Sequence, residues 1–113
     1  FMWNCSAELF ARWVELGAFY PFCRNHTAVR TRRQEPWKFG KEVEDIARQY
    51  IKLRYKLHPV MYTLMRESYE TGAPVLRPLF YEFQDDHGSA EIEDQCMFGP
   101  FMMLAPVVKK KAL

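Results

Sequence analysis

Apolar residues recur at helical spacing in two stretches of the chain. In the first, the apolar residues from Leu9 to Leu16 lie three or four positions apart after Ser6, which can cap a helix. This pattern predicts a helix over residues 6–16. Gly17 is expected to end it in the positive-φ conformation that glycine adopts cheaply.

The second helical pattern is longer and covers residues 41–71. Its apolar positions keep one face, acidic residues lie in its first turn, and Gly72 follows its last turn. Pro59 lies inside this pattern and predicts a kink, because proline donates no N–H and crowds the carbonyl four residues earlier.

The remaining apolar runs are short and predict strands. "AFYPF" predicts a short buried strand within residues 18–23. Residues 74–83 are expected to be extended, and residues 96–108 to form two strands separated by Gly99 and Pro100. Helices alternating with a strand, followed by strands alone, indicate an α/β domain over residues 1–73 and a β domain over residues 74–113.

Composition narrows the class of protein. The 113 residues are 49% hydrophobic and 16% aromatic, with a net charge of +2. This charge is too small to favour nucleic acid or an anionic membrane as a partner. Three cysteines without CxxC spacing favour free thiols in a reducing compartment. No apolar run approaches the roughly 20 residues of a membrane span and no signal peptide is visible, so we expect a cytoplasmic protein. Because the chain begins with Phe1 and ends after an apolar run, we also expect an internal piece of a longer protein.

Two groups of polar residues could carry chemistry. Arg24, Asn25 and His26 follow the predicted strand, where a barrel presents its functional face, and they could bind a polyol. The alternative is a structural arginine–carboxylate pair and a loop histidine. Asp85, Asp86 and His87 could hold a metal or form a hydrated turn, and we favour the turn. The sequence predicts no metal site and no cofactor.

Several stretches in order carry a family resemblance: "ELFARWVELGAFYPFCRNH", "QEPW", "LRYKLHPVMYTLMRESYETGAPVLRPLFYEF" and "MFGPFMMLAPVV". Together they resemble the later part of the catalytic region of glycoside hydrolase family 31, which contains α-glucosidases and α-xylosidases. The resemblance implies the last helices and eighth strand of a (β/α)8 TIM barrel, followed by the start of a C-terminal β-sandwich.

The resemblance also implies a function. Family 31 enzymes hydrolyse α-linked glycosides with retention, using a nucleophilic and an acid/base aspartate. The motifs that hold these aspartates, similar to "W-x-D-M-N-E" and "G-D-N", do not occur in this sequence. The resemblance assigns His26 and Phe1 to the −1 sugar subsite and places Arg24 near it. We therefore expect part of an enzyme that acts on α-linked gluco-oligosaccharides, inactive alone. The alternative is a non-catalytic fragment that self-associates or complements an upstream half.

Overall fold

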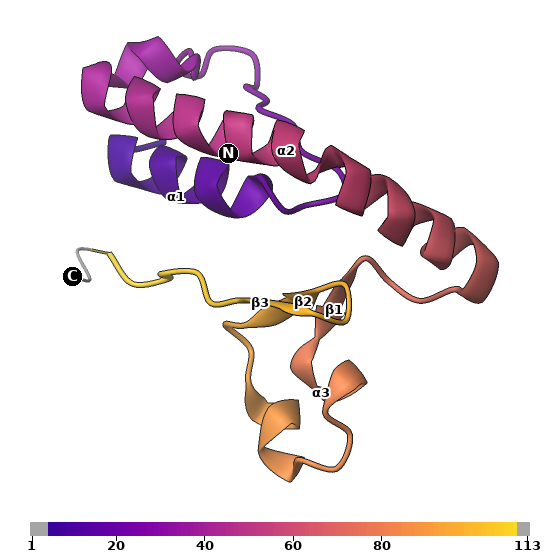
Figure 1. Cartoon of the computed structure of the whole chain (residues 1–113). Helices are drawn as coiled ribbons and strands as arrows, with labels where there is room; N and C mark the ends of the chain where they lie inside the picture. Colours follow the sequence, from indigo (N-terminus) through magenta and orange to yellow (C-terminus); the bar gives the residue numbers. More distant parts are fainter. Residues whose placement is uncertain (1–4, 111–113) are drawn as a thin grey trace. The chain divides into compact units, whose positions relative to one another are not determined.

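The computed structural model describes residues 5–110. These residues form two compact units, one reaching to Leu57 and the other covering His58–Lys109. The elements in chain order are α1 (Ala7–Gly17), η1 (Pro36–Phe39), α2 (Lys41–Thr71), β1 (Leu76–Pro78), α3 (Leu79–Glu82), η2 (His87–Glu91), β2 (Cys96–Phe98) and β3 (Met102–Leu104) (Figure 1).

Both predicted helices are confirmed, and their ends are set by local caps. Ser6 is extended at the start of α1, and its hydroxyl accepts a hydrogen bond from the Leu9 N–H at 3.2 Å. The Glu8 carboxylate lies in the first turn, where the helix dipole favours a negative charge. At the end of α2, Gly72 takes φ +79, which stops the helix without a Cβ clash.

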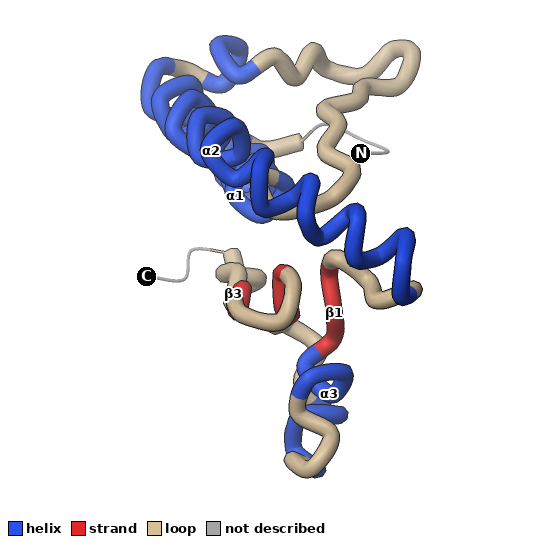
Figure 2. Tube along the Cα trace, turned by 45° about the vertical axis from the view of Figure 1, so that its right-hand side comes forward, coloured by secondary structure: helices blue, strands red, loops and turns tan. Residues whose placement is uncertain are grey.

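In the first unit, α1 lies beside the first half of α2 (Figures 1 and 2). Phe10 of α1 and Val43 and Ala47 of α2 are buried together with Cys5. The Phe10 ring also stacks on Phe39 of η1, with ring centroids 4.5 Å apart. This small apolar core holds the two helices and the loop that joins them.

The strand expected over residues 18–23 does not form. This segment is turn and coil, and Phe22 is 75% exposed. A barrel strand needs neighbouring strands to receive its N–H and C=O groups. Within residues 5–110, the strands are β1, β2 and β3, and they pair only with one another. The end of α1 also differs from expectation, since Gly17 lies inside the helix and Ala18 continues it with φ −59.

The second unit contains a three-stranded antiparallel sheet in the order β1–β2–β3. Leu76 pairs with Phe98, and Phe98 pairs with Met102, so the prediction of two strands around Gly99 is confirmed. The extended prediction for residues 74–83 is only partly right, because β1 ends at Pro78 and α3 begins at Leu79. Leu79 is 3% exposed, and this burial accounts for a helical turn that local propensity did not indicate.

Gly99 makes the turn between β2 and β3 close to α2. Its φ is +61, and its N–H donates to the Val75 carbonyl at 2.8 Å. A Cβ at this position would lie 2.7 Å from Cδ2 of Leu64, a side chain that is itself buried. The glycine therefore provides both the backbone angle and the space that the turn needs.

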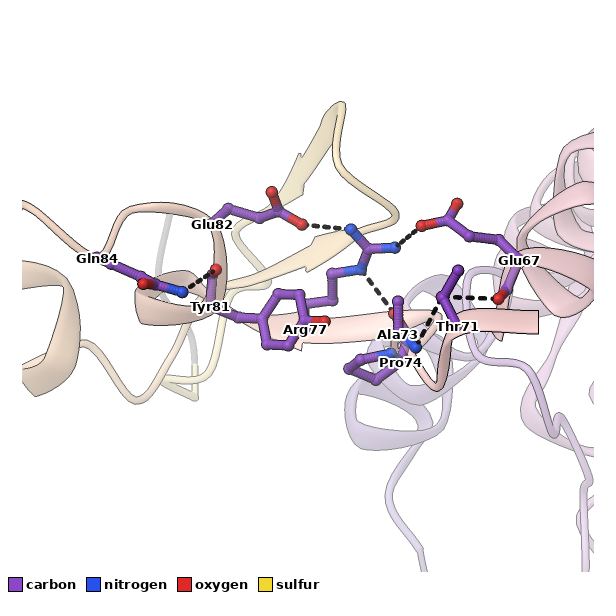
Figure 3. A network of polar contacts seen from close by, with 8 residues as sticks. All are labelled: Glu67, Thr71, Ala73, Pro74, Arg77, Tyr81, Glu82 and Gln84. Atoms are coloured by element: carbon purple, nitrogen blue, oxygen red, sulfur yellow. Dashed lines mark hydrogen bonds and ion pairs between the residues drawn. The ribbon is translucent and has the colours of Figure 1, made fainter. Parts of the chain in front are cut away.

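Arg77 lies at the centre of a network of polar contacts in the second unit (Figure 3). Its side chain is 5% exposed and forms ion pairs with Glu67 at 2.7 Å and with Glu82. Its Nε donates to the Pro74 carbonyl at 2.7 Å, and its guanidinium lies 5.4 Å from the centre of the Tyr81 ring. The arginine thus joins the last turns of α2 to β1 and α3.

Within residues 5–110, no helix is both long enough and apolar enough to cross a membrane.

Candidate functional site

The site predicted from sequence lies in the segment between α1 and η1. Arg24, Asn25 and His26 are all exposed there, in coil rather than at the end of a strand. The structure brings two of the predicted residues together, since Arg24 Nη2 lies 2.9 Å from His26 Nδ1. Because a guanidinium only donates hydrogen bonds, Nδ1 is the acceptor in this pair and Nε2 of His26 is left to face other groups. Phe1 lies outside the described residues.

Asn25 forms a structural hydrogen bond within this loop. Its side-chain nitrogen donates to the main-chain carbonyl of Gln34 at 2.6 Å, so the amide ties residues 24–26 to the loop that precedes η1. Gln34 is 2% exposed, and within the described part of the chain its own side-chain amide has no hydrogen-bond partner. Gln34 therefore acts as a buried anchor for the exposed Asn25.

A hollow of about 400 Å³ lies in this unit. Its lining is mostly apolar and includes the aromatic residues Trp13, Tyr20 and Phe22. Arg24 and Asn25 also line it and add polar groups. His26 is not one of its described lining residues, and neither is any carboxylate. Aromatic faces next to a few hydrogen-bond donors can bind a sugar. Without a carboxyl pair, the described lining cannot hydrolyse a glycosidic bond.

Sequence reasoning missed Arg54, which reaches this segment from α2. Its Nη1 donates to the carbonyls of Gly17, Ala18 and Tyr20 at 3.2, 3.2 and 2.6 Å, and Nη2 donates to that of Pro21 at 3.3 Å. The available signal was indirect: the last turn of α1 carries no basic residue of its own. The N–H groups of Phe19 and Tyr20 donate to the carbonyls of Leu16 and Gly17, and Arg54 adds a side-chain donor from α2.

The other chemically interesting residues have structural roles. The Asp86 carboxylate accepts from the Gly88 N–H at 2.9 Å and caps η2, in agreement with the turn interpretation of residues 85–89. Burial raises the pKa of the Cys5 and Cys96 thiols, so neither is activated as a thiolate nucleophile. Within residues 5–110, no group of three histidine, cysteine or acidic side chains is arranged to hold a metal ion.

Comparison with known families gives two matches that together cover most of the chain. Residues 1–64 match the glycosyl hydrolases family 31 TIM-barrel domain. Residues 72–113 match the glycosyl hydrolase family 31 C-terminal domain.

Individual relatives agree with these matches. The chain is 47% identical to alpha-glucosidase 2 of Bacillus thermoamyloliquefaciens over 96% of its length, which is 14% of that protein. Among solved structures, the family 31 dextranase of Flavobacterium johnsoniae, complexed with glucose, is 42% identical with a TM-score of 0.89, over 94% of this chain and 13% of that one. An α-xylosidase from a soil metagenome, complexed with xylose, is 31% identical with a TM-score of 0.83, over 97% of this chain and 20% of that one. The chain therefore spans only a small part of the proteins it matches.

Proposed function

Since the chain belongs to glycoside hydrolase family 31, we propose that it is the part of an enzyme hydrolysing α-linked gluco-oligosaccharides that contributes to the −1 sugar subsite. The substrate class rests on one comparison. The chain is 47% identical to an α-glucosidase and 42% identical to a dextranase, but 31% identical to an α-xylosidase. Its barrel-domain part would provide the subsite, and the boundary with the C-terminal domain would fall between residues 73 and 74.

In this proposal His26 binds a sugar hydroxyl. Its Nδ1 is engaged by Arg24, so Nε2 is the nitrogen that would face the hydroxyl. Arg24 would hold the ring in that orientation, and Phe1 would pack beside the sugar. Retention requires two carboxyl groups roughly 5–5.5 Å apart. Because the described hollow has no carboxylate, the nucleophile and the acid/base would come from another part of the whole enzyme.

A chimeric enzyme tests this function. The segment of the Bacillus α-glucosidase that matches this chain is replaced by the chain itself, and turnover of an aryl α-glucoside is measured. We expect the chimera to be active, the isolated chain to be inactive, and His26→Ala to lower kcat/KM in the chimera by about 5- to 150-fold, the equivalent of about 1–3 kcal/mol for an unpaired buried hydroxyl.

Cys23→Ala is the matched control, because Cys23 is an exposed neighbour of the same segment and is a free thiol. It should leave kcat/KM within twofold of the unmodified chimera. Equal effects of the two substitutions would remove His26 from the subsite. A folded chimera that turns over no α-glucoside would refute the substrate class.

One observation favours a second candidate, a non-catalytic role in association. Leu9 and Trp13 on α1 are 43% and 46% exposed, and Phe22 is 75% exposed. Exposed large apolar side chains of this kind can drive binding to a second copy or to a complementing polypeptide.

A further inference from the structure

The main-chain carbonyls at the end of α1 and in the segment after it need hydrogen-bond donors. The last carbonyls of a helix have no partner inside the helix, and α1 has no basic residue in its last turn. Residues 18–23 are also not paired with β1, β2 or β3. Local main-chain bonds from Phe19 to Leu16 and from Tyr20 to Gly17 hold the first turn after α1. A side chain from α2 adds to them along the path toward Arg24 and His26.

Arg54 supplies these donors. Its two terminal nitrogens donate to four main-chain carbonyls at 2.6–3.3 Å, those of Gly17, Ala18, Tyr20 and Pro21. The acceptors lie 33–37 residues earlier in the chain than Arg54, so the contact depends on the packing of α1 against α2. A planar guanidinium can serve several acceptors at once, whereas a lysine ammonium offers three donors at a single point.

A second anchor holds the far end of the same segment. Asn25 donates to the Gln34 carbonyl at 2.6 Å, and Gln34 is buried. Only residues 22–24 lie between the last carbonyl that Arg54 holds and Asn25, and His26 is the next residue after Asn25. The chain path to His26 is therefore held at two points, by Arg54 at residues 17–21 and by Gln34 at Asn25.

We propose that Arg54 is a positioning residue for His26: it fixes the chain path that presents the imidazole to the sugar. This inference rests on the proposed subsite role of His26. Arg54 itself touches main-chain carbonyls, so its effect on turnover passes through the position of His26.

The test uses the chimeric α-glucosidase and three substitutions in α2. Arg54→Gln removes the charge and most of the N–H donors. Arg54→Lys keeps the charge but loses the planar arrangement of guanidinium donors. Arg48→Gln is the matched control. Arg48 lies on the same helix and pairs with Glu44 one turn away at the surface. We expect kcat/KM to fall about 10- to 100-fold with Arg54→Gln, less with Arg54→Lys, and less than twofold with Arg48→Gln.

A double-mutant cycle separates positioning from general stability. If Arg54 acts through His26, adding Arg54→Gln to His26→Ala should cost less than threefold more. A full additional loss in that background would overturn the positioning role and leave a purely structural one. Activity unchanged by Arg54→Gln, while His26→Ala reduces it, would also overturn this inference and leave the subsite proposal standing.

A readout independent of turnover completes the test. Hydrogen exchange of the peptide covering residues 17–26 is measured by mass spectrometry in the same chimeras. We expect about tenfold faster exchange with Arg54→Gln than with Arg48→Gln. If His26→Ala has no effect on turnover, the subsite proposal fails, and with it the catalytic consequence of Arg54. Unchanged exchange in residues 17–26 with both Arg54 variants would overturn the anchoring itself, even in an inactive chimera.

Discussion

Arg77→Met is expected to destabilise the second unit strongly. Methionine keeps an unbranched apolar stem of similar length but removes the guanidinium, which is 5% exposed and pairs with Glu67 and Glu82. The Pro74 carbonyl loses its donor as well. The substitution therefore leaves two carboxylates and one carbonyl without their common partner.

The magnitude follows from the exposure of the partners. Hydrogen bonds to charged groups contribute about 1.5–3 kcal/mol, and breaking a buried ion pair costs about 3–5 kcal/mol. Glu67 is 37% exposed and Glu82 22% exposed, so water recovers part of the loss, mostly at Glu67. We therefore expect the free energy of unfolding of this unit to fall by about 3 kcal/mol.

The charge of Arg77 is constant across any practical pH range. Burial acts to lower the pKa of Arg77, but hydrogen bonds to Glu82 and Glu67 and their negative charges outweigh it, so that the pKa is raised above its ordinary value. The comparison of variants can therefore be made at neutral pH with the guanidinium fully charged.

Hydrogen exchange of the amides in β1 and β2 is the assay. A loss of about 3 kcal/mol corresponds to roughly 150-fold faster exchange of amides that open with the whole unit. Arg66→Met is the control, because both contacts of Arg66 are at the surface. Arg66 pairs with Glu70, with side chains 65% and 51% exposed, and lies 5.7 Å from the centre of the exposed Tyr69 ring, so the substitution should change exchange less than threefold. If Arg77→Met also stays within threefold, the buried network contributes little and the reasoning is wrong.

Three further changes have defined outcomes. Gly99→Ala should lower the free energy of unfolding by about 2 kcal/mol, since alanine at φ +61 is strained and its Cβ would meet Leu64; urea denaturation measures this, and a loss below about 0.5 kcal/mol would contradict it. The pKa of Tyr50 is raised, first by its hydrogen bond to Glu15 and then by burial. The contribution of the neutral Tyr50 hydroxyl to the free energy of unfolding is therefore complete below the ordinary tyrosine pKa of 10.0. It is lost as pH rises through the higher pKa of the folded state. The difference in melting temperature between the chain and Tyr50→Phe should therefore shrink between pH 8 and pH 11, and a constant difference would refute the linkage. The isolated chain should self-associate at micromolar concentration and bind a hydrophobic dye, and Trp13→Glu should weaken both because Trp13 is 46% exposed; a dye-free monomer in sedimentation would count against this.

The family and the helices were readable from the sequence because their signals are local. The Ser6 hydroxyl reaches an N–H three residues away, and Gly72 ends α2 through its own backbone angle. Such features depend on a few neighbouring residues, so the order of amino acids is sufficient to predict them.

The candidate site was only partly predictable. Sequence picked out Arg24 and His26, which the structure brings within hydrogen-bonding distance, while their roles toward a sugar stay predictions. It misplaced the segment that carries them, because a strand is defined by neighbours and not by its own residues. The sequence also left open a polyol contact for Asn25, and it could not show that the Asn25 amide donates to the Gln34 carbonyl.

The long-range contacts were decided by tertiary structure alone. Arg54 and Arg77 look like ordinary arginines in the sequence. Arg54 binds four main-chain carbonyls, and Arg77 is buried between two carboxylates. Their positions follow from helix packing and sheet register, which bring together groups up to 37 residues apart. Burial makes the contacts of Arg77 obligatory, because a buried charge without a partner costs several kcal/mol, which is a large part of the net stability of a folded unit.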